Sequence, residues 1–521
     1  MDAMSNGAQA MLAAARQSGA TLCFANPGTT EMPLVQALDD APGVRAVLGL
    51  FEGVCTGAAD GYGRMLGRPA LTLLHLGPGL ANGIANLHNA KRARSPVVNL
   101  IGQHTAEHLR LDTPLDSDIA ALAATVSSWT RTVASPEAMA ADMREAISHA
   151  GQATGHVATL IVPVDHQSAA VAPAIADAPP PASAIRARPS VAHEAVEGVA
   201  GLLRDDQPLV FLLGSDALSA RGQRAAARIA SATRARFYGE TFPARVERGG
   251  GLPDIDRLPY FPEPAIAALG QGSHVVLAGS AQPVSLFGYA GLPGTLSQPA
   301  RTLTLSAPGF DSAAALEALA EAVGAGTDAP GVATSLYPID DAPLTPTWIG
   351  RIVSNLLPED SIVSVEGSTC GYPFFTASAR ARRHTVMTNT GGSIGQGLPC
   401  ALGASLACPG QRVLVLQSDG SALFTIQALW TMAREQLPIT VLIASNRRYA
   451  ILQSELARMG ISKLGPQAER LTEFNDPPLD WVAMSRGYAV PAVRVQDTRE
   501  LERALGQALH SPGPMLIEMV L

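Results

Sequence analysis

The chain has 521 residues, of which 47% are hydrophobic and 16% are charged, a composition that suits large cores and excludes a disordered protein. Its 37 basic and 45 acidic residues give a net charge of −8, which excludes a strongly basic nucleic-acid-binding protein. The length allows three or four domains at roughly 100–200 residues each.

Membrane and export signals are missing from the sequence. No apolar run reaches the roughly 18 residues that span a bilayer. The first six residues carry neither the basic nor the apolar part of a signal peptide. The five cysteines are odd in number and show no C-x-x-C spacing. We therefore expect a cytoplasmic protein with reduced, mostly buried thiols and no membrane or nucleic-acid partner.

Short β-branched runs alternate with Ala-rich stretches of helical periodicity along the whole chain. The expected strands are 21–25, 47–51, 70–76, 96–101, 157–163, 208–213, 274–278, 301–305, 361–365, 412–417, 439–444 and 514–520. This alternation predicts an α/β fold of parallel sheets with helices on both faces.

Two segments have the composition of linkers. Residues 172–189 contain three consecutive prolines, and residues 324–346 are rich in Pro, Gly, Asp and Ala. They divide the chain into three predicted domains, 1–172, 190–324 and 346–521, each expected to hold a doubly wound parallel sheet.

The most specific motif lies in the last predicted domain. Strand 412–417 is followed by Ser418-Asp419-Gly420-Ser421, and strand 439–444 is followed by Ser445-Asn446-Arg447-Arg448-Tyr449. Ligands bind beyond the carboxyl ends of parallel strands, so Asp419 and Asn446 should lie at one sheet edge. Their oxygens suit Mg²⁺, and Gly420 allows a phosphate to approach the backbone. The alternative is that these are ordinary turn residues after strands.

This pattern resembles the diphosphate-binding motif of thiamine diphosphate enzymes, G-D-G followed after about 24–27 residues by N-N. Ser418 and Ser445 depart from it, but neither position supplies a metal ligand in that family. The resemblance implies that Asp419, Asn446 and Arg448 hold Mg²⁺. It also implies that Gly420, Ser421 and Tyr449 contact the cofactor.

Glu52 is a second candidate, in the first predicted domain. It follows the apolar run 47–51, where an unpaired carboxylate is costly, although a helix start or a salt bridge would also explain it. Residues 52–62 resemble the segment after the catalytic glutamate of the same enzymes. In that family the glutamate bonds N1′ of the aminopyrimidine and so helps to deprotonate thiazolium C2.

His75 precedes Gly77-x-Gly79-x-x-x-Gly83, which is one residue too long for the dinucleotide motif G-x-G-x-x-G. The sequence therefore lacks the motif that an NAD-dependent dehydrogenase would need. His75 falls where benzoylformate decarboxylases have a proton-relaying histidine, and the alternative is a structural histidine. Thr29 follows Asn26-Pro27-Gly28, at the position of the substrate-contacting serine of those decarboxylases.

Residues 390–399 form a glycine-rich stretch that resembles the cofactor-supporting segment of the family. By position, Ile394 would be the wedge under the two cofactor rings, and the Gly392 carbonyl would accept from N4′. Ser368 would add a hydroxyl to the diphosphate. The alternative is a glycine-rich helix start packed on a sheet.

The resemblance implies cleavage of a 2-oxo acid through a C2 ylide and an enamine. A benzoylformate decarboxylase-like enzyme is favoured, although its central-domain histidine has no counterpart in 283–289. An acetolactate synthase-like carboligase is the alternative, although its F-Q-E segment is absent and the sequence does not support FAD. His104, with His108, either lines the substrate cleft or caps a loop.

A non-catalytic, cofactor-binding family member is a further alternative. The presence of Glu52, Asp419 and Asn446 together argues against it. The resemblance finally implies a homodimer or homotetramer with the active site between subunits. Glu52 and Asp419 of one site would then come from different chains.

Overall fold

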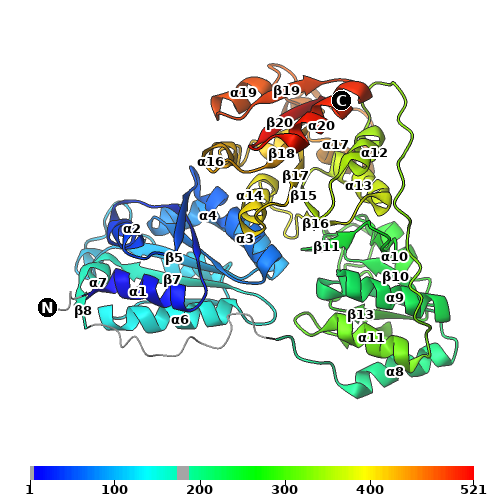
Figure 1. The fold of residues 1–521 in the computed structure, drawn as a ribbon, viewed down its shortest axis with the longest axis horizontal. Coiled ribbons are helices and arrows are strands. Elements are labelled where there is room, and N and C mark those ends of the chain that lie inside the picture. Colours follow the sequence, from blue (N-terminus) through cyan, green and yellow to red (C-terminus); the bar gives the residue numbers. More distant parts are fainter. Residues whose placement is uncertain (1–4, 173–186) are drawn as a thin grey trace.

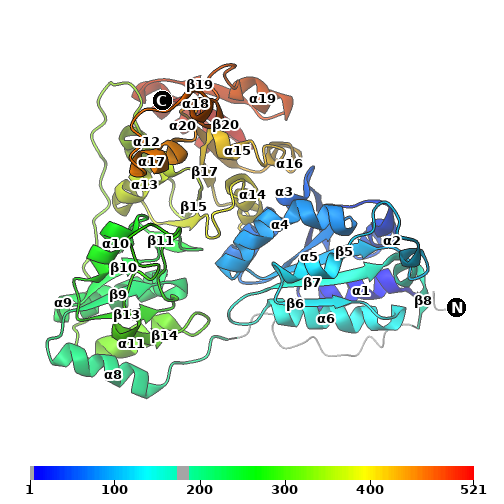
Figure 2. The same ribbon diagram turned by 180° about the vertical axis from the view of Figure 1, so that it is seen from behind.

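The computed structural model describes residues 5–172 and 187–521, which form three lobes, each built on its own parallel sheet (Figures 1 and 2). We call the lobes first, central and third in the order of the chain. A short antiparallel pair, β1 (Ser5–Asn6) and β8 (Ala170–Val171), closes the first lobe. The predicted α/β class with several parallel sheets is confirmed.

The first sheet has six parallel strands in the order β3-β2-β4-β5-β7-β6. They are β2 (Leu22–Asn26), β3 (Arg45–Leu48), β4 (Ala70–Leu74), β5 (Val97–Gln103), β6 (Trp129–Thr132) and β7 (Val157–Pro163). Helices α1 (Gly7–Gln17), α2 (Met32–Asp39) and α6 (Met139–Ala150) cover one face, and α3 (Glu52–Leu66), α4 (Leu76–Ala93) and α5 (Ile119–Ala124) cover the other. Every residue of β4, β5 and β7 is buried, which explains their unbroken apolar sequences.

The central sheet has five parallel strands in the order β12-β10-β9-β13-β14. They are β9 (Leu209–Leu213), β10 (Arg236–Gly239), β12 (Asp256–Arg257), β13 (His274–Ala278) and β14 (Thr302–Ser306). Helices α8 (His193–Arg204), α9 (Ala220–Ala232) and α11 (Ser312–Ala322) pack on one face, and α10 (Pro262–Leu269) packs on the other.

The third sheet has seven strands in the order β11-β16-β15-β17-β18-β20-β19. They are β15 (Ser361–Val365), β16 (His384–Thr388), β17 (Val413–Ser418), β18 (Ile439–Ser445), β19 (Ala492–Val495), β20 (Met515–Val520) and the edge strand β11 (Val246–Arg248). The main helices are α12 (Pro346–Leu356), α13 (Ser368–Ala377), α14 (Gly397–Ala407), α16 (Ala428–Arg434), α17 (Ala450–Arg458), α18 (Pro466–Thr472), α19 (Trp481–Gly487) and α20 (Thr498–His510).

Strand β11 differs from the expectation of a purely parallel third sheet. It comes from the central part of the chain and pairs antiparallel with β16. A three-residue strand carries no periodic signal of its own, so only its neighbour identifies it. The sequence pattern also did not predict five other strands, because they are short, polar or partly exposed. These are β6, β10, β12, β16 and β19.

The expected strand at 47–51 is wrong at its end, because β3 stops at Leu48. Glu52 instead begins helix α3 after a three-residue connection. The expected linker at 172–189 lies mostly outside the described residues. Of the second expected linker, 324–346, residues 325–342 form no helix or strand, and α12 begins at Pro346.

The first and third lobes are locked together by α3 and α14, which lie side by side in Figure 1. A Cβ atom on Gly403 would lie 1.8 Å from the carbonyl oxygen of Ala58, and one on Gly61 would lie 2.0 Å from that of Cys400. Glycine is therefore required at both crossings. This packing holds the helix that begins with Glu52 firmly against the third lobe.

No helix among the described residues is both long and apolar enough to cross a membrane.

Candidate active site

Asp419 and Asn446 lie at the same edge of the third sheet, as predicted. Strands β17 and β18 are parallel neighbours, with Ser418 opposite Ala444, and each of the two residues directly follows its strand. Asp419 is buried. Its Oδ2 accepts a hydrogen bond from the Arg447 N–H (2.6 Å), and its Oδ1 accepts one from the Gly420 N–H (2.9 Å).

Burial raises the pKa of Asp419 to about 6 although backbone N–H groups donate to it, and no basic side chain of the described residues forms an ion pair with it. A bound metal ion would supply a positive charge, so the carboxylate suits a hard cation. Within 5–172 and 187–521, no group of three His, Cys, Asp or Glu residues could hold a metal. The remaining ligands would therefore be of other kinds, such as the Asn446 side chain, the Arg448 carbonyl and phosphate oxygens.

Gly420 is packed against the ring of Tyr449. A Cβ atom on Gly420 would lie 2.5 Å from Cε1 of that ring, which itself packs on Phe474. Ser421 donates to the Gln417 side chain (2.9 Å) and so is held against the sheet. Ser368 is exposed at the start of α13, beyond the neighbouring strand β15. Gly420, Ser421, Tyr449 and Ser368 thus lie beyond the carboxyl ends of neighbouring parallel strands, where ligands of such sheets bind.

The glycine-rich stretch forms a loop that enters α14, and a buried carboxylate holds it. Glu366 accepts hydrogen bonds from the N–H groups of Gly395 and Gly397 (both 2.5 Å) and from the Gln417 side chain (2.8 Å). Burial raises the pKa of Glu366. Sequence reasoning missed this role, although a carboxylate directly after a buried strand was the available signal.

The two predicted cofactor contacts of this loop are accessible. Gly392 is exposed with φ +75°, a backbone conformation that favours glycine. Ile394 is 39% exposed although it is a large hydrophobic residue. An apolar side chain presented by a tightly bonded loop is suited to contact a ligand.

Glu52 and His75 lie together at the carboxyl edge of the first sheet. His75 follows β4 and precedes α4, and Glu52 accepts from Asn82 of α4 (3.0 Å). A Cβ atom on Gly79 would lie 3.4 Å from Glu52 Oε1 and 3.5 Å from His75 Cβ, so the two side chains flank this glycine. Thr29 is exposed in the turn after β2.

The contacts of His104 lie within its own loop. Its Nε2 lies 3.1 Å from the Thr113 hydroxyl, and its ring lies 5.2 Å from that of His108. These partners belong to the same connection after β5. No hydrogen bond among the described residues links His104 to Glu52 or His75.

Within one chain the glycine-rich loop lies against the back of α4. Asn89 bonds the carbonyl of Ser393 (2.8 Å), and Asn86 bonds the carbonyls of Gly53 (2.8 Å) and Gly395 (3.3 Å). In the described part of the chain, no hydrogen bond or ion pair joins Glu52 to Asp419. The Glu52 side and the Asp419 side of the predicted site therefore belong to lobes that pack together, but the two side chains do not interact directly.

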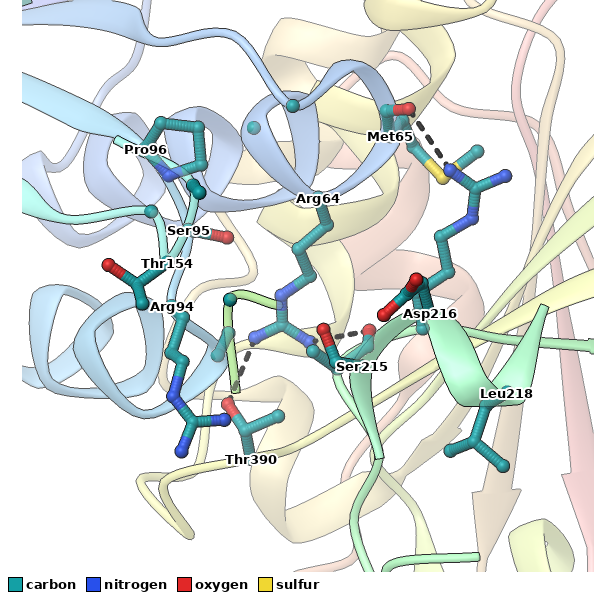
Figure 3. A pocket seen from close by; sticks show the side chains of 18 of the residues that line it. Arg64, Met65, Arg94, Ser95, Pro96, Thr154, Ser215, Asp216, Leu218 and Thr390 are labelled. Carbon is teal, nitrogen blue, oxygen red and sulfur yellow. Dashed lines mark hydrogen bonds between the residues drawn. The ribbon is translucent and has the colours of Figure 1, made fainter. Parts of the chain in front are cut away.

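A separate cleft of about 680 Å³ lies between the first and central lobes, and Figure 3 shows side chains that line it. In its wall, Arg64 of the first lobe donates to the Thr390 hydroxyl of the third lobe (3.2 Å), with Arg94 and Asp216 nearby. Burial raises the pKa of Glu240 in its wall to about 7. Apart from Thr390, at the start of the glycine-rich stretch, none of the residues predicted for the active site lines this cleft.

Comparison with known proteins identifies two matching domains. The thiamine pyrophosphate enzyme N-terminal binding domain matches residues 5–122, and the corresponding C-terminal binding domain matches residues 369–519. These two regions contain Glu52, His75, Asp419 and Asn446.

Relatives and solved structures agree with this match along the whole chain. The chain is 46% identical over 516 residues to the "Putative acetolactate synthase large subunit IlvX" of Mycobacterium tuberculosis, covering 99% of each chain. It is 29% identical over 537 residues to the benzoylformate decarboxylase of Pseudomonas aeruginosa, covering 97% of this chain and 96% of the relative.

A solved structure, the thiamine diphosphate-dependent 4-hydroxybenzoylformate decarboxylase of Rhodococcus jostii RHA1, has the same fold. It superposes with a TM-score of 0.85 at 24% identity, covering 99% of this chain and 98% of the other. Taken with the 46% identity along the full length, the matches show that this chain belongs to the thiamine diphosphate-dependent enzymes of the acetolactate synthase and benzoylformate decarboxylase family.

Proposed function

We propose that the protein is a thiamine diphosphate- and Mg²⁺-dependent, benzoylformate decarboxylase-like enzyme that cleaves a 2-oxo acid in the cytoplasm. The observation that carries this proposal is the joint presence of two sites. Glu52 and His75 flank Gly79 at one sheet edge, and Asp419 and Asn446 follow adjacent strands of another.

The residues of the third lobe would bind and orient the cofactor. Asp419, Asn446 and the Arg448 carbonyl would hold Mg²⁺ on the diphosphate. Gly420, Ser421, Ser368 and Tyr449 would line the diphosphate.

The glycine-rich loop would hold the two rings of the cofactor. Ile394 would support the rings from below, and the Gly392 carbonyl would accept from the exocyclic amine. The Glu366 bonds to Gly395 and Gly397 pre-organise this loop before the cofactor binds.

The residues of the first lobe would handle protons. Thiamine diphosphate held here would supply a carbon nucleophile for the 2-oxo carbonyl and a ring able to accept the electron pair that the loss of CO₂ releases. Glu52 would bond the aminopyrimidine nitrogen and keep the reactive tautomer populated. His75 would exchange a proton with the reacting substrate, beside Thr29.

We further propose that the active unit is a homodimer or homotetramer. Glu52 and Asp419 have no direct interaction within one described chain, and Ile394 stays exposed. Both features suit a site that two subunits complete. A strictly monomeric active species in solution would contradict this arrangement.

A carboligase of the acetolactate synthase type is the second candidate. The relative with 46% identity carries that name, and residues 283–289 contain no histidine to protonate a decarboxylation product. Incubation with benzoylformate and with pyruvate separates the candidates, because both reactions release CO₂ but only carboligation gives a coupled hydroxyketone. Aldehyde as the main product supports the decarboxylase, and no CO₂ from any of a panel of 2-oxo acids would refute both.

A further inference from the structure

Glu31 is a fully buried carboxylate in the first lobe that the reaction outlined above does not use. Its side chain is 0% exposed at the end of the short turn after β2. Oε2 accepts from the Gly28 N–H (2.7 Å) and lies 2.8 Å from His75 Nδ1, while Oε1 accepts from the Thr30 hydroxyl (2.6 Å). Among the described residues, no lysine or arginine forms an ion pair with it.

The backbone packs closely against Glu31 and one side of the His75 ring. A Cβ atom on Gly28 would lie 2.3 Å from the His75 ring, and one on Gly102 would lie 1.6 Å from Glu31 Oε1. These glycines follow β2 and lie within β5, while His75 follows β4, so three neighbouring strands contribute. Gln167 fixes the turn by donating to the Thr30 carbonyl (3.0 Å).

A buried carboxylate is costly unless its oxygens are hydrogen-bonded. The Gly28 N–H and the Thr30 hydroxyl each donate to this carboxylate, and the third contact becomes a hydrogen bond when His75 carries a proton on Nδ1. That arrangement makes Nε2 the ring nitrogen available for exchange. In the described residues, Nε2 has no hydrogen-bond partner, and the His75 side chain remains 22% exposed.

We propose that Glu31 is a positioning residue that holds His75 in the Nδ1–H tautomer and presents Nε2 to the substrate. The inference rests on the proposed proton-transfer role of His75. The titratable groups around the ring are Glu31 on one side and Glu52 across Gly79. Thr30, whose hydroxyl lies 3.3 Å from Nδ1, is the other polar contact.

The first test needs neither substrate nor a variant of Glu31. Nitrogen-15 NMR of the wild-type protein at alkaline pH reports which ring nitrogen of each neutral histidine carries the proton. The His75 signals are assigned by their absence from His75→Phe. We expect the Nδ1–H tautomer, and the Nε2–H tautomer would overturn the proposal even if turnover is normal. A failure to cleave any 2-oxo acid would instead refute the proposed function and leave this result standing.

The second test asks whether Glu31 acts through His75. We expect Glu31→Gln to lower kcat by roughly 10- to 100-fold and to leave the cofactor-induced melting shift unchanged. In the His75→Phe background the same substitution should have no further effect on kcat. An equal loss in both backgrounds would overturn the proposal. Glu145→Gln, the same change at a half-exposed position of α6, is the matched control.

Discussion

Asp419→Asn should change the stability of the protein in opposite directions with and without the cofactor. The substitution keeps the size of the side chain but removes the charge that would bind Mg²⁺. At about 100 times its Kd, a ligand stabilises the folded state by about 2.7 kcal/mol. Loss of a metal ligand should weaken binding by at least about 100-fold, which leaves about 0.4 kcal/mol at the same concentration.

Without the cofactor the same carboxylate destabilises the folded protein. Burial raises the pKa of Asp419 from 3.8 to about 6, so the folded state favours the protonated form. The stabilisation that the protonated Asp419 side chain gives the folded state is therefore fully present below pH 3.8 and is lost as the pH rises through 6. The pKa difference of roughly two units corresponds to about 3 kcal/mol of unfolding free energy. About 2 kcal/mol of this is lost between pH 4.5 and 7.5.

Thermal melting measures both effects. A change of 1 kcal/mol shifts the Tm of a domain of this size by roughly 2–4 °C. For cofactor-free protein, the Tm of Asp419→Asn relative to wild type should therefore rise by several degrees between pH 4.5 and 7.5. With thiamine diphosphate and Mg²⁺, wild type should gain several degrees and the variant about one.

The control is Asp206→Asn, the same change at an aspartate whose side chain is 72% exposed in the central lobe. It should leave both the pH dependence and the cofactor shift unchanged. A stability difference between Asp419→Asn and wild type that does not vary with pH would refute the burial argument. An undiminished cofactor shift in Asp419→Asn would refute the metal-binding role.

Three further predictions use the same melting and turnover assays. Glu52→Gln should abolish turnover while keeping the cofactor-induced Tm shift, and retained activity would contradict its role as the proton-handling carboxylate. Gly420→Ala should weaken cofactor binding at least tenfold, because its Cβ would lie 2.5 Å from the Tyr449 ring and displace it; unchanged affinity by titration calorimetry would show that the ring moves freely. Burial lowers the pKa of His384 from 6.5 to about 4, so the stability it contributes above pH 6.5, about 3 kcal/mol, is lost as the pH falls through 4. His384→Asn should therefore melt with less pH dependence than wild type between pH 6.5 and 4, and equal slopes would be the contrary result.

The sequence predicted those features that depend on local pattern and chain order. Strands 157–163, 274–278 and 361–365 have their predicted bounds, because parallel strands buried on both faces read as continuous apolar runs. Asp419 and Asn446 meet at one edge because a crossover helix between consecutive strands makes those strands parallel neighbours.

The tertiary structure alone decided the features that depend on distant neighbours. Strand β11 is identified only by its pairing with β16, and β10 is half-exposed at one side of its sheet. Glu31 carries no distinguishing signal in the sequence, and the position of Glu366 after a buried strand does not reveal its partners. Their roles come from His75, 44 residues away, and from the loop 29 to 31 residues further on, which folding places within hydrogen-bond distance. Local pattern reports which side chains are buried, whereas the partner of a buried charge is set by which strand ends the fold brings together.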